Sequence, residues 1–169
     1  MAKALGHRVI VTLRQMSKAD FCRQLGADDV VVLDEQWSDV VLEKTAGRGV
    51  DVILDMLGTA TAAGDMRVLA RRGRLAWIAF LTGSRMEIKV HEVMGKEAVL
   101  TGAFLRPQSA DTKAQLAQGL REHIWPKIEQ GLIVPMVHQV FAFAQVREAH
   151  QYMESNQHSG KLVLSWMND

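Results

Sequence analysis

The feature that most constrains the fold of this chain is a regular alternation of short apolar runs with segments of helical periodicity. Runs such as VVVL at 30–33 are typical of β-strands that are covered on both faces. The pattern predicts strands at residues 7–13, 29–33, 50–57, 74–81, 98–105, 137–143 and 160–166. It predicts helices at residues 17–25, 37–46, 59–72, 110–130 and 144–155. Strands and helices in this order form a mainly parallel sheet through right-handed crossovers, so the expected fold class is α/β.

Four residues give more specific signals for the helix ends. Gly26 is expected to end the first helix and Gly73 the third, because glycine adopts the left-handed conformation of a helix C-terminus without strain. Ser38 is a possible N-cap of the second helix. Pro126 lies inside the long fourth helix, which it is expected to kink or restart.

Composition excludes several classes of protein. The 169 residues are 48% hydrophobic and 23% charged, which fits one globular domain with its own core. The net charge is only +1, without a basic stripe, so nucleic-acid binding is not predicted. No apolar stretch reaches the roughly 20 residues of a membrane span, and no signal-peptide pattern opens the chain. The single Cys22 is expected to be a partly buried helical thiol, and a reducing cytoplasmic location is expected.

Several runs of the sequence together resemble a known family. They are GRGVDVILDMLG (47–58), GRLAWIAFLTG (73–83), LTGAFLRPQS (100–109), REHIWPKIEQG (121–131) and EAHQYMESNQHSGKLVL (148–164). In order and spacing they resemble the C-terminal half of zinc-free NADPH-dependent quinone oxidoreductases of the medium-chain dehydrogenase/reductase superfamily. The resemblance implies a Rossmann-like, mainly parallel sheet flanked by helices and incomplete at its N-terminal end. It also implies a partial dinucleotide-binding domain at 1–133 and a segment at 134–169 that returns to the family's catalytic domain.

The family's glycine-rich turn has no counterpart in this sequence. In a dinucleotide fold these glycines let the backbone approach the pyrophosphate at a helix N-terminus. The GRG at 47–49 is too short and precedes a strand, so it is interpreted as an ordinary turn. The chain is therefore expected to be a truncated or fragmentary member of the family. A start site placed too far downstream is the alternative.

The resemblance implies that the segment TLRQMSK at 12–18 contacts the adenosine end of a cofactor. By resemblance, Arg14 and Lys18 recognise the ribose 2′-phosphate, which a guanidinium fork and an ammonium can both pair with. No acidic residue ends the preceding strand to accept a ribose hydroxyl, which favours NADP(H) over NAD. Alternatively, both side chains are ordinary solvated charges.

The ends of the later strands supply the other predicted cofactor contacts, because open α/β sheets bind ligands at the carboxyl ends of their strands. The resemblance places Asp55, Met56 and Gly58 on the adenosine side. On the nicotinamide side it places Phe80, Leu81, Gly83, Phe104, Leu105, Arg106, Gly160 and Lys161. Alternatively, Phe80 and Phe104 belong to the core, Asp55 caps a helix, and Lys161 is a solvated charge.

Other chemistries lack their motifs. The six histidines show no metal-ligand spacing, so no metal site is predicted. No G-x-S-x-G turn exposes a serine nucleophile, and the sequence names no catalytic residue.

In the family, a hydride passes from NADPH to a quinone or activated carbonyl compound, and this chain is expected to have reduced or no independent activity. The alternative is a non-catalytic interaction module with weak or no nucleotide binding. For either function a homodimer is expected through the strand Ala98 to Leu105, an apolar edge without proline or charge.

Overall fold

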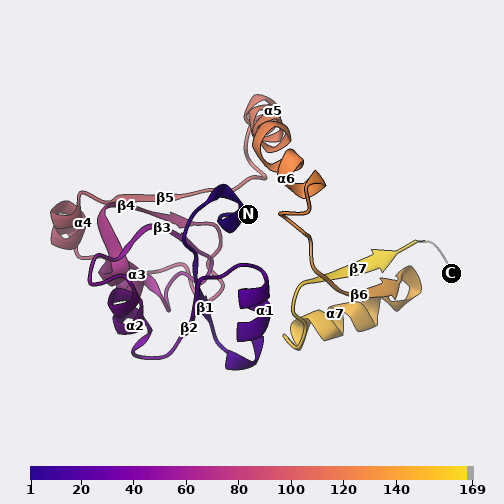
Figure 1. The fold of residues 1–169 in the computed structure, drawn as a ribbon, viewed down its shortest axis with the longest axis horizontal. Coiled ribbons are helices and arrows are strands. Elements are labelled where there is room, and N and C mark those ends of the chain that lie inside the picture. Colours follow the sequence, from indigo (N-terminus) through magenta and orange to yellow (C-terminus); the bar gives the residue numbers. More distant parts are fainter. Residues whose placement is uncertain (167–169) are drawn as a thin grey trace.

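The computed structural model describes residues 1–166, and every strand pairing within them is parallel. The strands form three sheets (Figure 1). They are β1 (Ile10–Leu13) with β2 (Asp29–Val32); β3 (Val50–Asp55) with β4 (Leu69–Trp77) and β5 (Val99–Gly102); and β6 (Val137–Ala142) with β7 (Lys161–Ser165). The predicted α/β class with parallel pairing is confirmed, although the strands do not join into one sheet.

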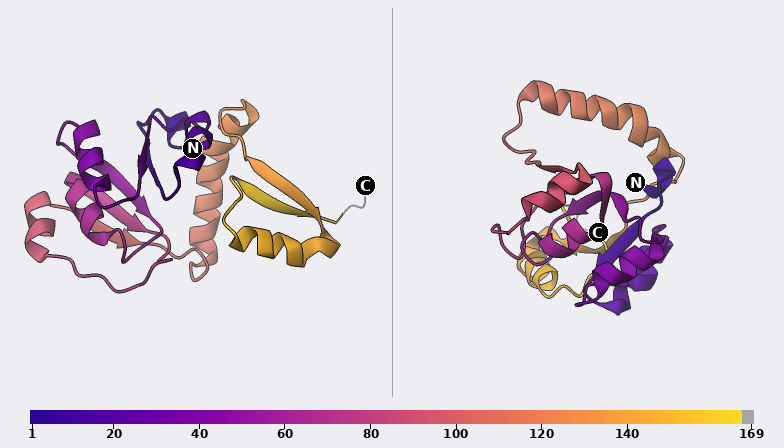
Figure 2. Two further views of the ribbon diagram at one scale, coloured as in Figure 1. Left: turned by 90° about the horizontal axis from the view of Figure 1, so that it is seen from below. Right: turned by 90° about the vertical axis from the view of Figure 1, so that its left-hand side faces the viewer.

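Helices connect successive strands. They are α1 (Ala19–Gln24), α2 (Trp37–Lys44), α3 (Ala62–Val68), α4 (Val90–Lys96), α5 (Ala110–Gly119), α6 (Trp125–Glu129) and α7 (Val146–Glu154). Three 3-10 turns, η1 (Lys3–Leu5), η2 (Met16–Lys18) and η4 (Phe143–Gln145), and a π-helical turn, η3 (Leu120–Ile124), complete the chain. The segment from α5 to α6 stands away from the sheets as one rod (Figure 2). Within residues 1–166, no helix has both the length and the apolar composition that a membrane span requires.

The first two sheets share one covered face. A cluster of buried side chains, Val31, Trp37, Val41 and Val68, receives Ile10 of β1 and both Val50 and Ile53 of β3. A second cluster joins Met66 of α3 to Leu69 and Leu75 of β4, and it receives Leu100 of β5. Helices α2 and α3 therefore hold β1 and β3 against a common core.

The opposite face of β3 is bare. Val52 is 65% exposed and Leu54 is 62% exposed. The apolar run at 50–57 predicts burial on both faces, and for this face the prediction is wrong. The reason is that within residues 1–166 the two core clusters lie on the other side of the strand.

The third helix is shorter than its periodicity predicts. Helix α3 ends at Val68, and residues 69–72 belong to β4 instead. Leu69 pairs with Val50 and then the register shifts, so that Val52 pairs with Arg74. Within this bulge, the backbone of Arg72 has the left-handed conformation, with a φ of 62°. Gly73 therefore lies within a bulged strand and does not end a helix.

Some of the other predictions for the helices are confirmed by the structure, and others are wrong. Ser38 lies inside α2, where its hydroxyl accepts a hydrogen bond from Arg67 at 3.0 Å, so the predicted N-cap is wrong. Pro126 lies at the start of α6, after the π-helical turn, as the predicted restart requires. Cys22 is a half-buried thiol on α1, as predicted. Helix α4 was not predicted.

The C-terminal elements form a separate β-α-β unit, in which α7 covers one face of β6 and β7. Phe141 and Ala149 are each 7% exposed at this contact. On the strands, Val137, Val140 and Val163 remain exposed. The Phe143 and Trp166 rings are stacked, with centroids 3.7 Å apart. The predicted boundary between 133 and 134 stays a prediction, and residues 167–169 of the C-terminal segment lie outside the described residues.

Candidate nucleotide site

Three loops follow the carboxyl ends of the parallel strands β3, β4 and β5, and they carry most of the predicted contact residues. The first two loops are joined by backbone hydrogen bonds. Leu81 N–H donates to the Met56 carbonyl at 3.0 Å, and Thr59 N–H donates to the Gly83 carbonyl at 3.2 Å. The two loops therefore act as one surface at the edge of the sheet where α/β proteins bind ligands.

Asp55 organises the first of these loops. Its carboxylate accepts hydrogen bonds from Leu57 N–H and Gly58 N–H, each at 2.8 Å, and from the Thr61 hydroxyl at 3.2 Å. Only 6% of Asp55 is exposed. Because α3 begins at Ala62, Asp55 caps the turn before the helix, and the alternative that it caps the helix itself is wrong.

Two glycines permit the close approach of the loops. Gly58 has a φ of +82°, and a Cβ there would lie 2.4 Å from the Gly83 carbonyl oxygen. Gly83 has a φ of +136°, and a Cβ there would lie 2.7 Å from the Thr59 hydroxyl oxygen. Any larger residue at either position would separate the loops.

Phe80 and Phe104 meet at this edge with ring centroids 6.4 Å apart in an edge-to-face arrangement. They are 53% and 58% exposed, so the alternative that they are core residues is wrong. Leu81 and Leu105 beside them are also exposed. The structure thus brings together an open apolar wall from the loops after β4 and β5. The Arg106 side chain is exposed, and its carbonyl accepts a hydrogen bond from Lys113.

A buried acid lies beneath the first loop. Asp65 on α3 is 4% exposed, and its Oδ2 has no hydrogen-bond partner among the described residues. Burial, followed by the nearby charge of Asp55, raises the pKa of Asp65 to about 7, while the Thr61 hydroxyl opposes the shift. The site therefore contains a carboxyl group that titrates near neutral pH.

Arg14 and Lys18 follow β1, and the structure places them differently. The Arg14 side chain is exposed. The Lys18 ammonium donates hydrogen bonds to the carbonyls of Asn156 at 2.7 Å and His158 at 2.9 Å. Lys18 therefore fastens the first sheet to the loop before β7, and Arg14 is the more accessible of the two cations.

Gly160 and Lys161 lie at the end of the same loop. Gly160 has a φ of +108°, and a Cβ there would lie 2.5 Å from the Met136 carbonyl oxygen. The Lys161 side chain is exposed, while its N–H donates to that carbonyl at 2.8 Å. Lys18 thus connects the predicted adenosine side to this loop, but no described hydrogen bond joins the loop to Phe80 or Phe104.

Sequence reasoning missed the polar residues that hold the loops together. The Thr82 hydroxyl donates to the Leu57 carbonyl at 2.7 Å and accepts from Ala60 N–H at 3.0 Å. The Thr59 hydroxyl donates to the Arg85 carbonyl at 2.6 Å. A threonine directly beside each loop glycine was the available signal, because small hydroxyl residues favour turns. No comparable signal marked Asp65, which sits in an ordinary helical pattern.

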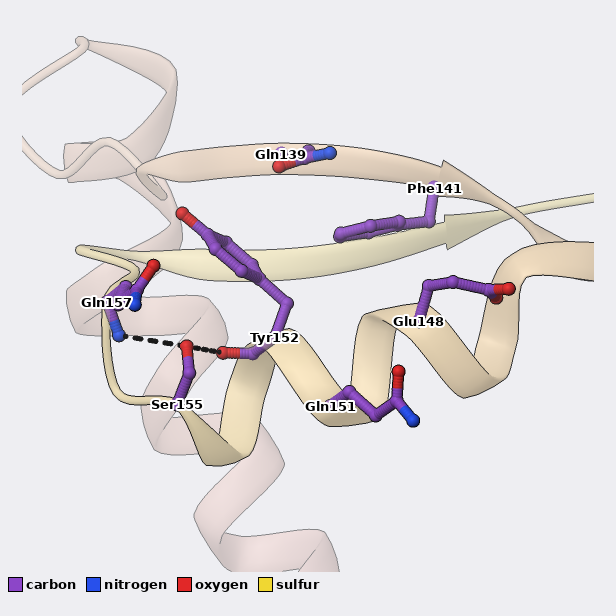
Figure 3. Close-up of a pocket in the computed structure, with 7 residues that line it drawn as sticks. All are labelled: Gln139, Phe141, Glu148, Gln151, Tyr152, Ser155 and Gln157. Atoms are coloured by element: carbon purple, nitrogen blue, oxygen red, sulfur yellow. Dashed lines mark hydrogen bonds between the residues drawn. The ribbon is translucent and has the colours of Figure 1, made fainter.

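The structure also has a shallow hollow in the C-terminal unit, between β6 and α7 (Figure 3). Its lining residues are Gln139, Phe141, Glu148, Gln151, Tyr152, Ser155 and Gln157. At the C-terminal end of α7, the Ser155 hydroxyl donates to the Tyr152 carbonyl at 2.7 Å. None of the predicted cofactor contacts lines this hollow, so we do not assign it to the candidate site.

Comparison with known proteins identifies relatives over nearly the whole chain. It is 29% identical to a 2-haloacrylate reductase of a Burkholderia species, covering 96% of this chain and 49% of that protein. It is 29% identical to a quinone oxidoreductase of Pseudomonas aeruginosa, covering 96% of this chain and 50% of that protein. Among solved structures, a mycobacterial protein complexed with NADPH matches with a TM-score of 0.79 and 28% identity, covering 96% of this chain and 50% of that one. The chain thus spans about half the length of these relatives.

A family model described as zinc-binding dehydrogenase matches residues 25–164. The description names zinc, but within residues 1–166 no group of three histidine, cysteine, aspartate or glutamate side chains could hold a metal ion. The described residues therefore offer no zinc site. Because the family model covers most of the chain and quinone oxidoreductases match it throughout, the chain belongs to the zinc-binding dehydrogenase family, within the medium-chain dehydrogenase/reductase oxidoreductases.

Proposed function

We propose that this chain is the nucleotide-binding part of an NADPH-dependent oxidoreductase that reduces quinones or activated carbonyl compounds. The observation that carries the proposal is the paired-loop surface after β3, β4 and β5, with its exposed Phe80 and Phe104 wall. An exposed apolar wall beside hydrogen-bonded loops suits a nicotinamide ring, and the relatives include quinone oxidoreductases.

The residues present would hold the two ends of NADP(H). Arg14 would pair with the 2′-phosphate, the loop that Asp55 organises would carry the adenosine side, and Phe80 with Phe104 would orient the nicotinamide. When bound, the cofactor supplies a hydride to the substrate carbonyl or quinone. Backbone donors for the pyrophosphate are not provided by a glycine-rich turn within this sequence, so we propose that turnover by this chain alone is low. A binding titration of NADPH against this chain tests the proposal, because binding at this surface does not require turnover, and the absence of NADPH binding would contradict it.

Cofactor choice gives a first prediction. NADPH is expected to bind more tightly than NADH, and Arg14→Ala is expected to remove most of the difference. One charge-assisted contact to phosphate contributes on the order of 1.5–3 kcal/mol, or about one to two decades in affinity. Titration calorimetry with both cofactors measures this, with Arg121→Ala on η3 as a control that should leave the ratio unchanged. Equal affinities in the unaltered chain would contradict the assignment.

Self-association gives a second prediction. We propose that β5 pairs antiparallel with its own copy across a two-fold axis, because β5 forms the outer edge of its sheet and Val99 is 44% exposed there. The N–H of Ala103 faces β4, so by alternation the N–H of Gly102 faces outward. Gly102→Pro removes this outward N–H and should give monomers, whereas Gly102→Ala keeps it and should remain dimeric. Light scattering reports the mass of each variant. A monomeric unaltered chain at high micromolar concentration would show that this interface is wrong.

A further inference from the structure

Three buried polar side chains meet beneath the paired loops at 55–59 and 80–83. Asp55 ends β3, Thr61 directly precedes α3, and Asp65 lies in the first turn of that helix. They are 6%, 4% and 4% exposed. Asp65 N–H donates to the Thr61 carbonyl at 2.8 Å, which places the Thr61 and Asp65 side chains one helical turn apart on the same face. The three groups therefore form one cluster from which bulk water is largely excluded.

The Thr61 hydroxyl has more acceptors around it than it can satisfy. It donates to Asp55 Oδ1 at 3.2 Å and to the Gly58 carbonyl at 3.3 Å, and its hydrogen bonding also opposes the rise in the pKa of Asp65. A hydroxyl has one donor hydrogen, so the strongest acceptor takes it from the others. Oδ2 of Asp65 has no partner within residues 1–166, so this carboxyl group lacks the donors that its ionised form requires.

Asp65 changes its charge near neutral pH. Its burial, and then the charge of Asp55, raise its pKa to about 7, so ionisation adds a second negative charge beside Asp55. The other charged groups on or next to α3 have partners of their own, lie on the opposite face of the sheet, or are exposed. They are Arg67 with Asp39 of α2; Lys96 of α4, beside Glu92, with the carbonyls of Met66, Arg67 and Leu69; Arg71 and Arg72 with Glu97; Arg74, which alternates with the core residue Leu75; and the exposed Arg85.

The Thr61 proton connects the charge of Asp65 to the first loop. While Asp65 is protonated, Thr61 donates to Asp55, and Asp55 holds the loop through three donors. Once Asp65 is ionised, its carboxylate is the acceptor without another donor, so it draws the Thr61 proton away from Asp55. Asp55 then keeps only the N–H groups of Leu57 and Gly58 and faces a second negative charge.

The second loop depends on the first. Leu81 N–H donates to the Met56 carbonyl at 3.0 Å, and Thr82 N–H donates to the Leu57 carbonyl at 2.9 Å. Both acceptors directly follow Asp55 in the chain. A first loop that Asp55 holds less firmly therefore also weakens its hydrogen bonds to the second loop.

We propose that Asp65, Thr61 and Asp55 form a proton-operated switch of the paired loops. Protonated Asp65 keeps the loops in the described arrangement, and ionised Asp65 loosens them. Asp65 is thus a positioning residue that acts through Thr61 and Asp55. The consequence for the cofactor, weaker binding at higher pH, rests on the function proposed above, whereas the switch itself is tested without cofactor.

Amide hydrogen exchange of the full, ligand-free chain, followed by NMR at pH 6 and pH 8, tests the switch. Protection factors are compared, because they remove the intrinsic dependence of exchange on pH. We expect those of Leu57, Gly58 and Leu81 to fall by about tenfold from pH 6 to pH 8, since opening of the loops lets Asp65 ionise as a solvated carboxyl does. These amides should stay less protected than that of Leu75, which is fully buried in β4.

Four variants assign the effect to its groups. Asp65→Asn should remove the fall, because asparagine cannot ionise, whereas Asp39→Asn alters an exposed carboxyl on α2 and should retain it. Thr61→Val removes the shared proton and should reduce the fall to less than about threefold, whereas Thr61→Ser keeps the hydroxyl and should retain it. Because asparagine keeps the shape of Asp65, Asp65→Asn tests the switch even where Thr61→Val does not fold.

Three results would overturn the proposal. One is equal protection of the loop amides at pH 6 and pH 8. Another is a fall that persists in Asp65→Asn or stays at about tenfold in Thr61→Val. The third is protection of the loop amides equal to that of Leu75, because the loops would then open only when the whole protein unfolds. NADPH binding is measured separately, so failure of the proposed function is distinguished from failure of the switch.

Discussion

Replacing Asp65 with asparagine is expected to raise the free energy of unfolding at pH 8 by on the order of 3 kcal/mol. Asp65 is buried, its Oδ2 lacks a partner among residues 1–166, and its pKa is raised from 3.8 to about 7. Ionising it therefore places a second negative charge beside Asp55 in a poorly solvated position. Asparagine keeps the shape and cannot ionise.

The pH dependence follows from the direction of the shift. In the unfolded chain the group loses its proton near pH 3.8, and in the folded chain near pH 7. Between these values the unfolded state binds fewer protons, so stability falls as pH rises, by about 1.4 kcal/mol for each pH unit at most. Above pH 7 both states are ionised and the loss stays constant. Asp65→Asn should remove this decline.

Urea unfolding between pH 4 and pH 8 measures the effect. Asp39→Asn is the control, because the hydrogen bond and charge of Arg67 lower the pKa of this exposed carboxyl. It should change stability by less than about 1 kcal/mol. If Asp65→Asn leaves the pH profile of the unaltered protein in place, Asp65 does not titrate as its burial requires.

Replacing Gly58 with alanine is expected to destabilise the protein by roughly 2–4 kcal/mol and to open the paired loops. The residue has a φ of +82°, and its new Cβ would meet the Gly83 carbonyl oxygen at 2.4 Å. That carbonyl accepts the Thr59 N–H, so relieving the clash breaks a hydrogen bond between the loops. Any cofactor binding at this edge should weaken with it.

Gly47→Ala separates the two contributions to this effect. Gly47 has a φ of +78°, and a Cβ there would have nothing within 4 Å. The free energy of unfolding of the Gly47→Ala variant should therefore fall only by the cost of the left-handed conformation, about 1 kcal/mol. Urea unfolding gives both values, and equal losses in the two variants would show that the loop contact does not contribute.

Local patterns predicted most elements correctly, because burial on a sheet or helix imposes its own spacing of apolar residues. VVVL at 30–33 lies almost entirely in β2, and the restart at Pro126 is present. The predicted end of α3 was wrong because Leu69 and Ala70 continue the apolar helical spacing, whereas Leu69 pairs with Val50 of β3 before the register shift. The predicted N-cap at Ser38 was wrong because the Ser38 hydroxyl accepts a hydrogen bond from Arg67, which is distant in sequence.

For the candidate site, the sequence by itself determined the loop positions after β3, β4 and β5, the glycines within them, and the family. Only the tertiary structure decided that Phe80 meets Phe104, that Lys18 holds the loop before β7, and that Asp65 is buried beside Asp55. These contacts depend on which elements approach one another in space. Apolar periodicity predicts only that a residue is covered, and it does not specify by which other residue. For the same reason, the apolar run of β3 indicated two covered faces, whereas the packing of the described residues covers one.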